Sequence, residues 1–264
     1  MTTRHYILLL VGLIAALDLM AQSTAFPYPN LPDTLQDSRE RLVFLMDNYW
    51  QDYAFEDTTH TNILIGEQGF VDYINLFQYA DSAMCAHSAA IFADSISHSK
   101  ARTKRFEAWM DHYLGNHDSP LRNDVTYAHL IRAFPQTPQR TFLLRQITKN
   151  QPGEVATDFD FTDNQGVTQH LHDIRSQLIL LVFYDPDCDH CAEMLPKIKA
   201  NQDLQNNAFR LKTVYIDTNQ NPEAMEAFYL PSLPALYLLD LHKKVLVKDG
   251  SLEKVVECLH LILN

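Results

Sequence analysis

The sequence predicts two domains, an all-α domain followed by an α/β domain in which helices flank a central mixed sheet. Apolar side chains recur at spacings of three and four between about residues 33 and 149, as on the buried face of a helix. After residue 152, short β-type runs alternate with helical ones. With 264 residues, the chain is long for one compact domain and suffices for two separate cores.

The helical domain is predicted over residues 30–150. Its first helical stretch carries apolar side chains at Leu42, Leu45 and Tyr49, which are three and four residues apart. Polar and proline-containing breaks, such as residues 116–120, separate the later stretches. Further helices are expected near residues 67–80, 82–98, 102–114, 124–134 and 138–149.

The α/β domain is predicted over residues 152–264, and the break Asn150–Gly153 precedes it. Its first strands form a hairpin that turns at Gly166, and the unbroken apolar run Leu178–Tyr184 is typical of a buried central strand. The elements of this domain make a βαβ unit and then a ββα unit. After the central strand come a helix behind Cys188, a strand near Phe209–Ile216, a short helix near Pro222–Phe228, strands at Ala235–Asp240 and Lys244–Lys248, and a final helix from Leu252.

Composition indicates a folded chain, and charge argues against two classes of partner. Hydrophobic residues make up 46% of the chain and charged residues 20%, so the chain is too apolar for disorder. The formal net charge of −12 argues against binding of nucleic acid, because phosphates require a positive surface and the basic residues do not cluster. The same charge disfavours binding to an anionic membrane surface.

The first 21 residues are expected to be a secretory signal peptide. Arg4 precedes the apolar run Tyr6–Leu17, and Leu19-Met20-Ala21 provides a cleavage region. The run is shorter than the about 20 residues that span a bilayer, and Asp18 interrupts it, so an uncleaved membrane anchor is the disfavoured alternative. The mature protein is therefore expected in the periplasm of a Gram-negative-type bacterium, without a stable membrane span.

Two of the four cysteines, Cys188 and Cys191, are three positions apart and require a chemical explanation. The pair follows a buried strand and begins a helix, so the sulfur of Cys188 meets unpaired N–H groups that favour a thiolate. Cys188 is therefore predicted to be the nucleophile, and Cys191, one turn into the helix, the resolving thiol. Beyond this redox-active disulfide, we expect no cofactor and no metal ion.

Two segments, Phe183–Cys191 and Leu233–Asp240, resemble a known family. They are similar to the thioredoxin-like fold and, within it, to the exported TlpA/ResA-type thiol–disulfide oxidoreductases. The resemblance implies that Pro234 is a cis-proline beside the active site. It also implies that the backbone of Leu233 pairs with an extended substrate strand next to the sulfur. The similarity extends over residues 152–264.

The helical half resembles an uncharacterised domain that precedes thioredoxin-like domains in some exported bacterial proteins. The likeness rests on Tyr49-Trp50 with Phe55-Glu56-Asp57 and on the segment Ser119–Asp124. It implies an architecture and no activity. We expect Tyr49, Trp50 and Trp109 to be core residues; the alternative is that they form a groove for a partner.

The site departs from the general thioredoxin pattern at one position. That pattern has a buried acid six residues before the first cysteine, where this chain has Val182, so proton transfer to Cys191 must use another group or water. Asp189 lies where ResA-like members have an acid, and it either shuttles protons or is simply solvated. His190 lies where the strong oxidant DsbA has histidine and would stabilise a thiolate, whereas three neighbouring aspartates oppose that effect.

These observations predict a thiol–disulfide oxidoreductase that exchanges disulfides with exported proteins through the segment Cys188-Asp189-His190-Cys191. The TlpA-like surroundings and the anionic flank favour a reductase or isomerase over an oxidant. The expected partners are proteins with thiols or disulfides and an electron donor. The alternative is a non-catalytic partner-binding or scaffold protein in which the helical domain carries recognition.

Two other kinds of chemistry are disfavoured. A zinc site needs two further ligands and usually a second close pair, whereas Cys85 and Cys258 stand alone and fit the apolar stripes of helices. A disulfide between these two cysteines is a minor alternative to their roles as core residues. Thiol peroxidases usually carry a lone cysteine in a Thr-x-x-Cys context, which the segment from Tyr184 to Cys191 lacks.

Overall fold

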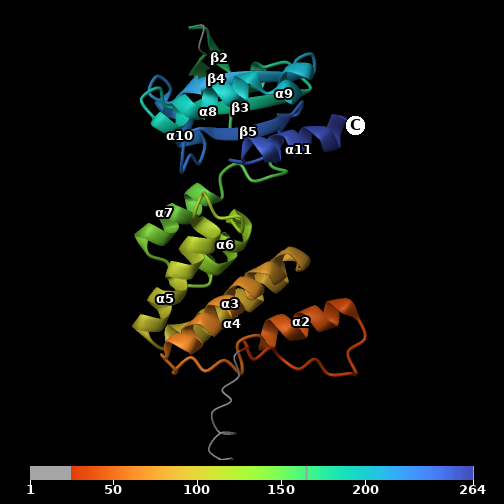
Figure 1. Cartoon of the computed structure of the whole chain (residues 1–264), viewed down its shortest axis with the longest axis vertical. Helices are drawn as coiled ribbons and strands as arrows, with labels where there is room; N and C mark the ends of the chain where they lie inside the picture. Colours follow the sequence, from red (N-terminus) through yellow and green to blue (C-terminus); the bar gives the residue numbers. More distant parts are fainter. Residues whose placement is uncertain (1–24, 164–165, 264) are drawn as a thin grey trace, which may run out of the picture. The chain divides into compact units, whose positions relative to one another are not determined.

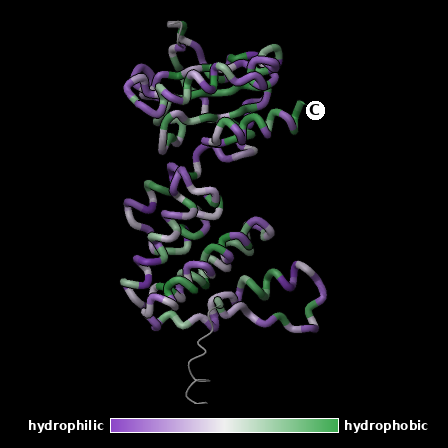
Figure 2. Tube along the Cα trace, in the orientation of Figure 1, coloured by the Kyte–Doolittle hydropathy of each residue, from purple (hydrophilic) through white to green (hydrophobic). Residues whose placement is uncertain are grey.

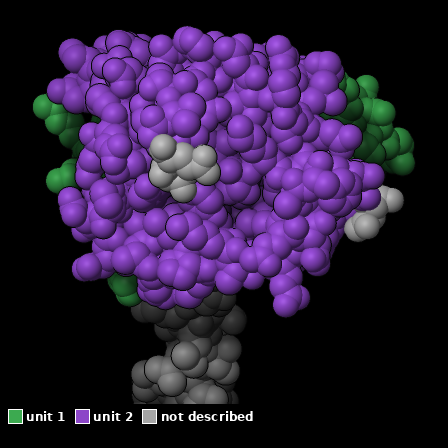
Figure 3. Space-filling model, turned by 90° about the horizontal axis from the view of Figure 1, so that it is seen from above, with its two compact units in different colours: residues 1–135 green, residues 136–264 purple. Residues whose placement is uncertain are grey.

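The structure of the chain is a computed structural model that describes residues 25–163 and 166–263 (Figure 1). The signal peptide expected over residues 1–21 lies outside these residues. The chain forms two compact units, one ending at Pro135 and the other beginning at Gln136. Figure 3 colours them separately. Within the described residues, no helix is long and apolar enough to cross a membrane.

The unit boundary falls before helix α7 (Pro138–Ile147). Hydrogen bonds around the end of this helix explain why it groups with the second unit. The Lys149 ammonium donates to the carbonyl of Glu226 at 2.6 Å, and the Asn150 amide donates to the carbonyl of Ala227 at 3.0 Å. The domain boundary predicted near residue 150 stays a prediction.

The described part of the first unit, from residue 25 onward, contains helices and no strands, as the sequence predicts. Asp37, Asp81 and Asn123 cap three of these helices, because each side chain accepts two backbone N–H groups of the first turn. The helix predicted near residues 102–114 ends in a π-helical turn. The described elements are α2 (Ser38–Asn48), α3 (His60–Leu76), the short 3-10 helix η1 (Phe77–Tyr79), α4 (Ser82–Ser97), α5 (Lys100–Met110), the π turn (Asp111–Gly115) and α6 (Asp124–Arg132).

An aromatic core holds these helices together. The Trp50 ring lies within 5.5 Å of the ring centroids of Tyr73, Phe92 and Phe106. The expectation that Tyr49, Trp50 and Trp109 are core residues is confirmed, because all three are buried. The close contact between helix α3 and the Phe26 ring requires glycine at position 69, because a Cβ there would lie 2.1 Å from that ring.

The second unit contains the predicted mixed sheet. Strand β3 (Leu178–Tyr184) is central, with β4 (Leu211–Asp217) parallel on one side and β5 (Ala235–Asp240) antiparallel on the other. Strand β6 (Val245–Val247) pairs antiparallel with β5, so the order is β4-β3-β5-β6. This topology confirms the βαβ and ββα units. The helices are α8 (Asp189–Ala200), α9 (Gln202–Asn206), α10 (Pro222–Ala227) and α11 (Leu252–Leu263).

Both faces of strand β3 are buried, which explains its unbroken apolar run. Leu180 and Val182 belong to the cluster that includes Ile198 of α8 and Leu259 of α11. The alternate residues, such as Phe183, belong to the second cluster, which contains the aromatic residues of the opposite face. Figure 2 shows the hydrophobic residues of this unit concentrated along its strands.

The predicted hairpin precedes the sheet. Strand β1 (Asp160–Thr162) pairs antiparallel with β2 (Thr168–His170), and Gly166 has a positive φ of 79°, which glycine adopts without strain. The Asn221 side chain ties the hairpin to the loop after β4. Its Oδ1 accepts the Thr162 N–H at 2.7 Å, and its Nδ2 donates to the Thr162 carbonyl at 3.1 Å.

Candidate functional site

The two neighbouring cysteines lie where strand β3 ends and helix α8 begins. Cys188 is the N-cap of α8, and its sulfur accepts the N–H of Cys191 at 3.4 Å. The preceding loop is fixed from within, because the Cys188 N–H donates to the Asp185 carbonyl at 3.2 Å and the Asp187 N–H donates to the Asp185 carboxylate at 2.8 Å. The predicted placement of the first sulfur over a helix N-terminus is therefore confirmed.

The two thiols differ in access to solvent. Cys188 is partly exposed, whereas Cys191 is buried, and neither takes part in a disulfide. Burial raises the pKa of the Cys191 thiol to about 11, and its hydrogen bond to Cys188 and the negative charge of Asp185 act in the same direction. A backbone hydrogen bond from Asp185 opposes these effects. Cys191 is thus a protonated thiol at neutral pH, and a reagent in solvent meets Cys188 first.

A backbone group from a distant loop lies beside the exposed sulfur. The Leu233–Pro234 peptide bond is cis, so the expected cis-proline is confirmed. The Cys188 thiol lies 3.9 Å from the carbonyl oxygen of Leu233. The structure therefore brings together four residues that the sequence singled out, namely both cysteines, Leu233 and Pro234.

The two residues between the cysteines, Asp189 and His190, face solvent, and within the described residues neither side chain is hydrogen-bonded to a cysteine sulfur. Both residues lie at the start of helix α8. Val182 is fully buried on the α8 side of the sheet, so the strand position that carries an acid in the general pattern is apolar here.

One side chain of this site is missed by reading the sequence alone. The Asn219 amide, in the loop after β4, donates to the Asp185 carboxylate at 3.0 Å. Parallel pairing explains the contact, because the register sets Tyr184 opposite Asp217 and both chains leave the sheet at the same edge. The polar run that follows strand β4 was the available signal, and it required the strand pairing to be known.

The remaining cysteines are structural. The buried Cys85 thiol lies 3.7 Å from the carbonyl of Phe77, and Cys258 packs at the edge of the α11 cluster. Burial raises the pKa of both thiols, which makes them poor nucleophiles. Neither forms a disulfide. In the part of the chain that the structure describes, no group of His, Cys, Asp and Glu side chains is suited to a metal ion.

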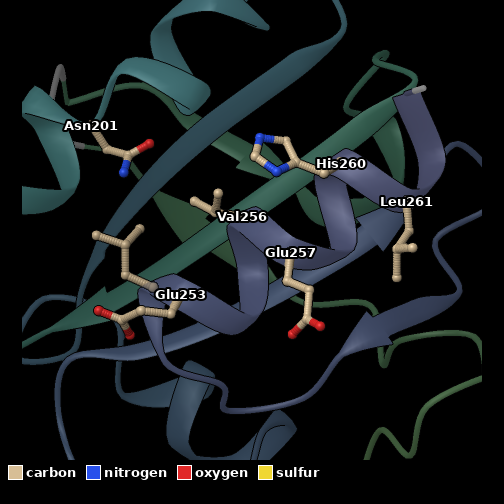
Figure 4. A pocket seen from close by; sticks show the side chains of 7 residues that line it. Asn201, Glu253, Val256, Glu257, His260 and Leu261 are labelled. Atoms are coloured by element: carbon tan, nitrogen blue, oxygen red, sulfur yellow. The ribbon is translucent and has the colours of Figure 1, made fainter.

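An open groove runs along helix α11 (Figure 4). Its lining includes Glu253, Val256, Glu257 and His260, with Asn201 at the start of α9. His260 is already engaged, since its Nε2 is 2.8 Å from the Asp203 carboxylate. The groove contains no cysteine, so it is separate from the dithiol.

Two family models match the chain. Residues 15–155 match the domain of unknown function DUF5106, and residues 152–256 match the AhpC/TSA family. No curated protein matches the chain.

One solved structure, the first of the three described here, shows the same fold. A thioredoxin-like protein from Bacteroides caccae is 23% identical, with a TM-score of 0.73, and the match covers 89% of this chain and 98% of that one. The C-terminal domain of an uncharacterized protein from Bacteroides fragilis is 28% identical over 43% of this chain and 99% of that one, with a TM-score of 0.38. The thioredoxin domain of a thiol–disulfide oxidoreductase from Bacteroides vulgatus is 14% identical, with a TM-score of 0.33 and coverage of 43% and 99%.

Proposed function

The chain belongs to the DUF5106 family and joins that domain to an AhpC/TSA thioredoxin-like domain, and from this premise we propose that Cys188 and Cys191 are the redox pair of a thiol–disulfide oxidoreductase. One observation carries the proposal. A partly exposed sulfur caps helix α8, and a buried thiol lies one turn further, with its N–H 3.4 Å from that sulfur. This arrangement separates an attacking thiol from a resolving thiol.

The reaction takes place in two exchanges. The Cys188 thiolate attacks a client disulfide, which forms a mixed disulfide and releases one client thiolate. The Cys191 thiolate then attacks the Cys188 sulfur, which closes the Cys188–Cys191 disulfide and releases the second client thiolate. The client gains two electrons and the protein loses two. A dithiol donor returns them before the next turnover.

The client strand would bind at the cis-proline loop. The backbone of Leu233 lies beside the Cys188 sulfur, which is where an extended client segment must lie to present its disulfide. Pro234, which follows Leu233, would border the same client segment. His190 and Asp189 border the site from the exposed start of helix α8, where they would tune the thiolate in opposite senses.

We favour reduction or isomerisation over oxidation. Three aspartates, Asp185, Asp187 and Asp189, lie within three residues of Cys188 along the chain, and their negative charges would oppose negative charge at this sulfur. A less stable Cys188 thiolate would make the reduced protein a better electron donor, so the dithiol should reduce client disulfides. The clients would be exported proteins of the periplasm, supplied with electrons by a separate donor.

The experiment that tests this function is a trap combined with an activity assay. A Cys191→Ser variant cannot resolve its mixed disulfide, so it should accumulate disulfide-linked clients that a reductant releases. Purified full-length protein with dithiothreitol should reduce insulin, and the Cys188→Ser variant should not. The Cys258→Ser variant is the control and should keep its activity.

The opposite result would be a folded protein that neither traps clients nor reduces insulin. Such a protein would fit the alternative of a partner-binding or scaffold protein and would contradict the proposed function.

A further inference from the structure

The short segment that carries Cys188 from strand β3 to helix α8 belongs to neither element, so hydrogen bonds must set its position. Asp185 supplies two of these bonds. Its carbonyl accepts the N–H of Cys188 at 3.2 Å, and its carboxylate accepts the N–H of Asp187 at 2.8 Å. The backbone at Cys188 is therefore held through Asp185.

A side chain from a second loop holds this aspartate. The amide of Asn219, in the loop after strand β4, donates to the Asp185 carboxylate at 3.0 Å. The accepting oxygen, Oδ1, is the one that also accepts the Asp187 N–H. We call this series of contacts, from Asn219 through Asp185 to the N–H groups of Asp187 and Cys188, the loop latch. One amide thus connects the loop after β4 with the backbone of Cys188.

The base of the loop latch is anchored to strand β3. The N–H and the hydroxyl of Thr218 donate to the carbonyl of Tyr184 at 2.9 and 3.1 Å. The N–H of Asn219 donates at 2.9 Å to the carboxylate of Asp217, which is buried. The neighbouring Gln220 takes no part in the latch, because its amide donates at 2.8 Å to the other oxygen of Asp217. The backbone of Asn219 should therefore keep its place when its side chain is changed.

The contacts of the Cys188 sulfur itself are weaker. The sulfur accepts the Cys191 N–H at 3.4 Å, and the thiol lies 3.9 Å from the carbonyl oxygen of Leu233. Sulfur is a weak acceptor, and a thiol is a weak donor. The backbone bond to Asp185 consequently restrains Cys188 on the side that α8 does not hold.

This restraint matters for closure of the disulfide. Cys188 and Cys191 are free thiols in this structure. A disulfide between them would fix Cys188 covalently, so the freedom of its loop in the dithiol state would be lost on closure. A latched loop has less freedom to lose, which favours closure.

We infer that Asn219 is a positioning residue of the redox site, which through the loop latch holds Cys188 in the place that favours the Cys188–Cys191 disulfide over the dithiol. This inference rests on the proposed function. With oxidised dithiothreitol as the acceptor, the two cysteines give up two electrons and two protons and form one S–S bond. The S–S bond of dithiothreitol breaks and becomes two thiols. Asn219 transfers neither electrons nor protons.

The equilibrium with reduced and oxidised dithiothreitol measures the contribution of the latch. Full-length protein is equilibrated, its thiols are alkylated, and peptide mass spectrometry quantifies the Cys188–Cys191 disulfide. Asn219→Ala should lower the equilibrium constant for disulfide formation by about threefold to tenfold, because a hydrogen bond that restrains the dithiol loop is lost. Gln220→Ala, the matched control from the same loop, leaves the latch intact and should change the constant by less than about twofold.

The rates of the two exchanges separate positioning from the reactivity of the sulfur. In a Cys258→Ser background, 5,5′-dithiobis(2-nitrobenzoate) should release one thionitrobenzoate when Cys188 attacks. A second is released when Cys191, its proton lost to solvent, attacks the mixed disulfide. Asn219→Ala should slow the second release by about threefold or more and the first by less than about twofold, because only the second requires both sulfurs in place.

Two variants of Asp185 test the route of the latch. Asp185→Asn keeps the Oδ1 atom that accepts both N–H groups, so its second release should be no slower than that of the unmodified protein. Asp185→Ala removes the acceptor and should slow the second release as Asn219→Ala does. The double variant Asp185→Ala/Asn219→Ala should be no slower than Asp185→Ala alone. Additive effects would contradict the coupling.

An equilibrium constant that is unchanged in Asn219→Ala, or that falls equally in Gln220→Ala, overturns the inference. If the unmodified protein forms no Cys188–Cys191 disulfide at any ratio of oxidised to reduced dithiothreitol, the proposed function itself fails. That result is distinct from a disulfide that forms independently of Asn219.

Discussion

Two helices of this molecule begin with a cysteine in their first turn, and the residues that cap them differ. In the helical unit, Asp81 caps α4 by accepting the N–H groups of Ala83 and Met84, and Cys85 points into the core. In the α/β unit, a sulfur provides the cap, since Cys188 accepts the N–H of Cys191 at 3.4 Å.

The difference shows how one local geometry serves structure in one place and chemistry in another. A carboxylate is a strong acceptor and makes a stable cap without reactivity. A sulfur is a weak acceptor, and it is a nucleophile that can exchange with a disulfide. A cysteine in the first turn of a helix therefore indicates redox chemistry only when the capping atom is also known.

Removal of Cys188 and removal of Cys85 should give the largest difference between the two helix starts. Cys188→Ala should lower the rate of insulin reduction to the background rate, because the attacking sulfur is lost. Cys85→Ala should leave the activity unchanged and destabilise the helical unit by about 1 kcal/mol, since a small buried side chain is lost. Activity assays and urea unfolding measure the two effects. Loss of activity in Cys85→Ala would show that the two helix starts are not functionally distinct.

The pH dependence of stability should show that the fold keeps the Cys191 thiol protonated. The pKa of Cys191 is raised from 9.0 in an ordinary cysteine to about 11, chiefly by burial, so the folded state holds its proton longer than the unfolded state. This contribution to stability is fully present below pH 9 and is lost as the pH rises from 9 towards 11. Unfolding of Cys188→Ser should show this decline.

The control for this titration is the double variant Cys188→Ser/Cys191→Ser, in which this part of the decline should be absent. An identical pH dependence in both proteins would mean that Cys191 is not held protonated by the fold.

Exchange of the capping atoms should give the smallest effects. Cys188→Ser should stabilise the α/β unit by about 0.5 kcal/mol, because a hydroxyl caps a helix better than a sulfur does. Asp81→Ala should destabilise the helical unit without changing insulin reduction. Thermal unfolding of each variant measures both shifts. A destabilised Cys188→Ser protein would indicate that the sulfur makes a structural contribution as well.

The sequence predicts much of the α/β unit because its signals are local. The apolar run Leu178–Tyr184, the cysteine spacing and the Gly166 turn each specify their own element. The contact of Asn219 with Asp185 could not be predicted, because it depends on the register of two parallel strands. The grouping of α7 with the second unit depends likewise on long-range hydrogen bonds, such as that from Lys248 to Ile147.

The helical unit shows the complementary difficulty. Helical spacing predicts its helices, and the burial of Trp50 follows from the same pattern. Gly69 was not singled out, because its need for close approach to Phe26 arises only when α3 and the N-terminal segment pack together. The π turn at Asp111–Gly115 also depends on tertiary packing, since the Asp111 carboxylate accepts a hydrogen bond from the Tyr127 hydroxyl.

The redox equilibrium of the dithiol tests the central claim most directly. Full-length protein equilibrated with mixtures of reduced and oxidised dithiothreitol, or of reduced and oxidised glutathione, should show one two-electron transition, and peptide mass spectrometry should locate it at the Cys188–Cys191 disulfide. The account predicts a potential nearer to the about −270 mV of thioredoxin than to the about −120 mV of DsbA. A potential near that of DsbA would contradict the direction of transfer, and no disulfide between these cysteines would contradict the site itself.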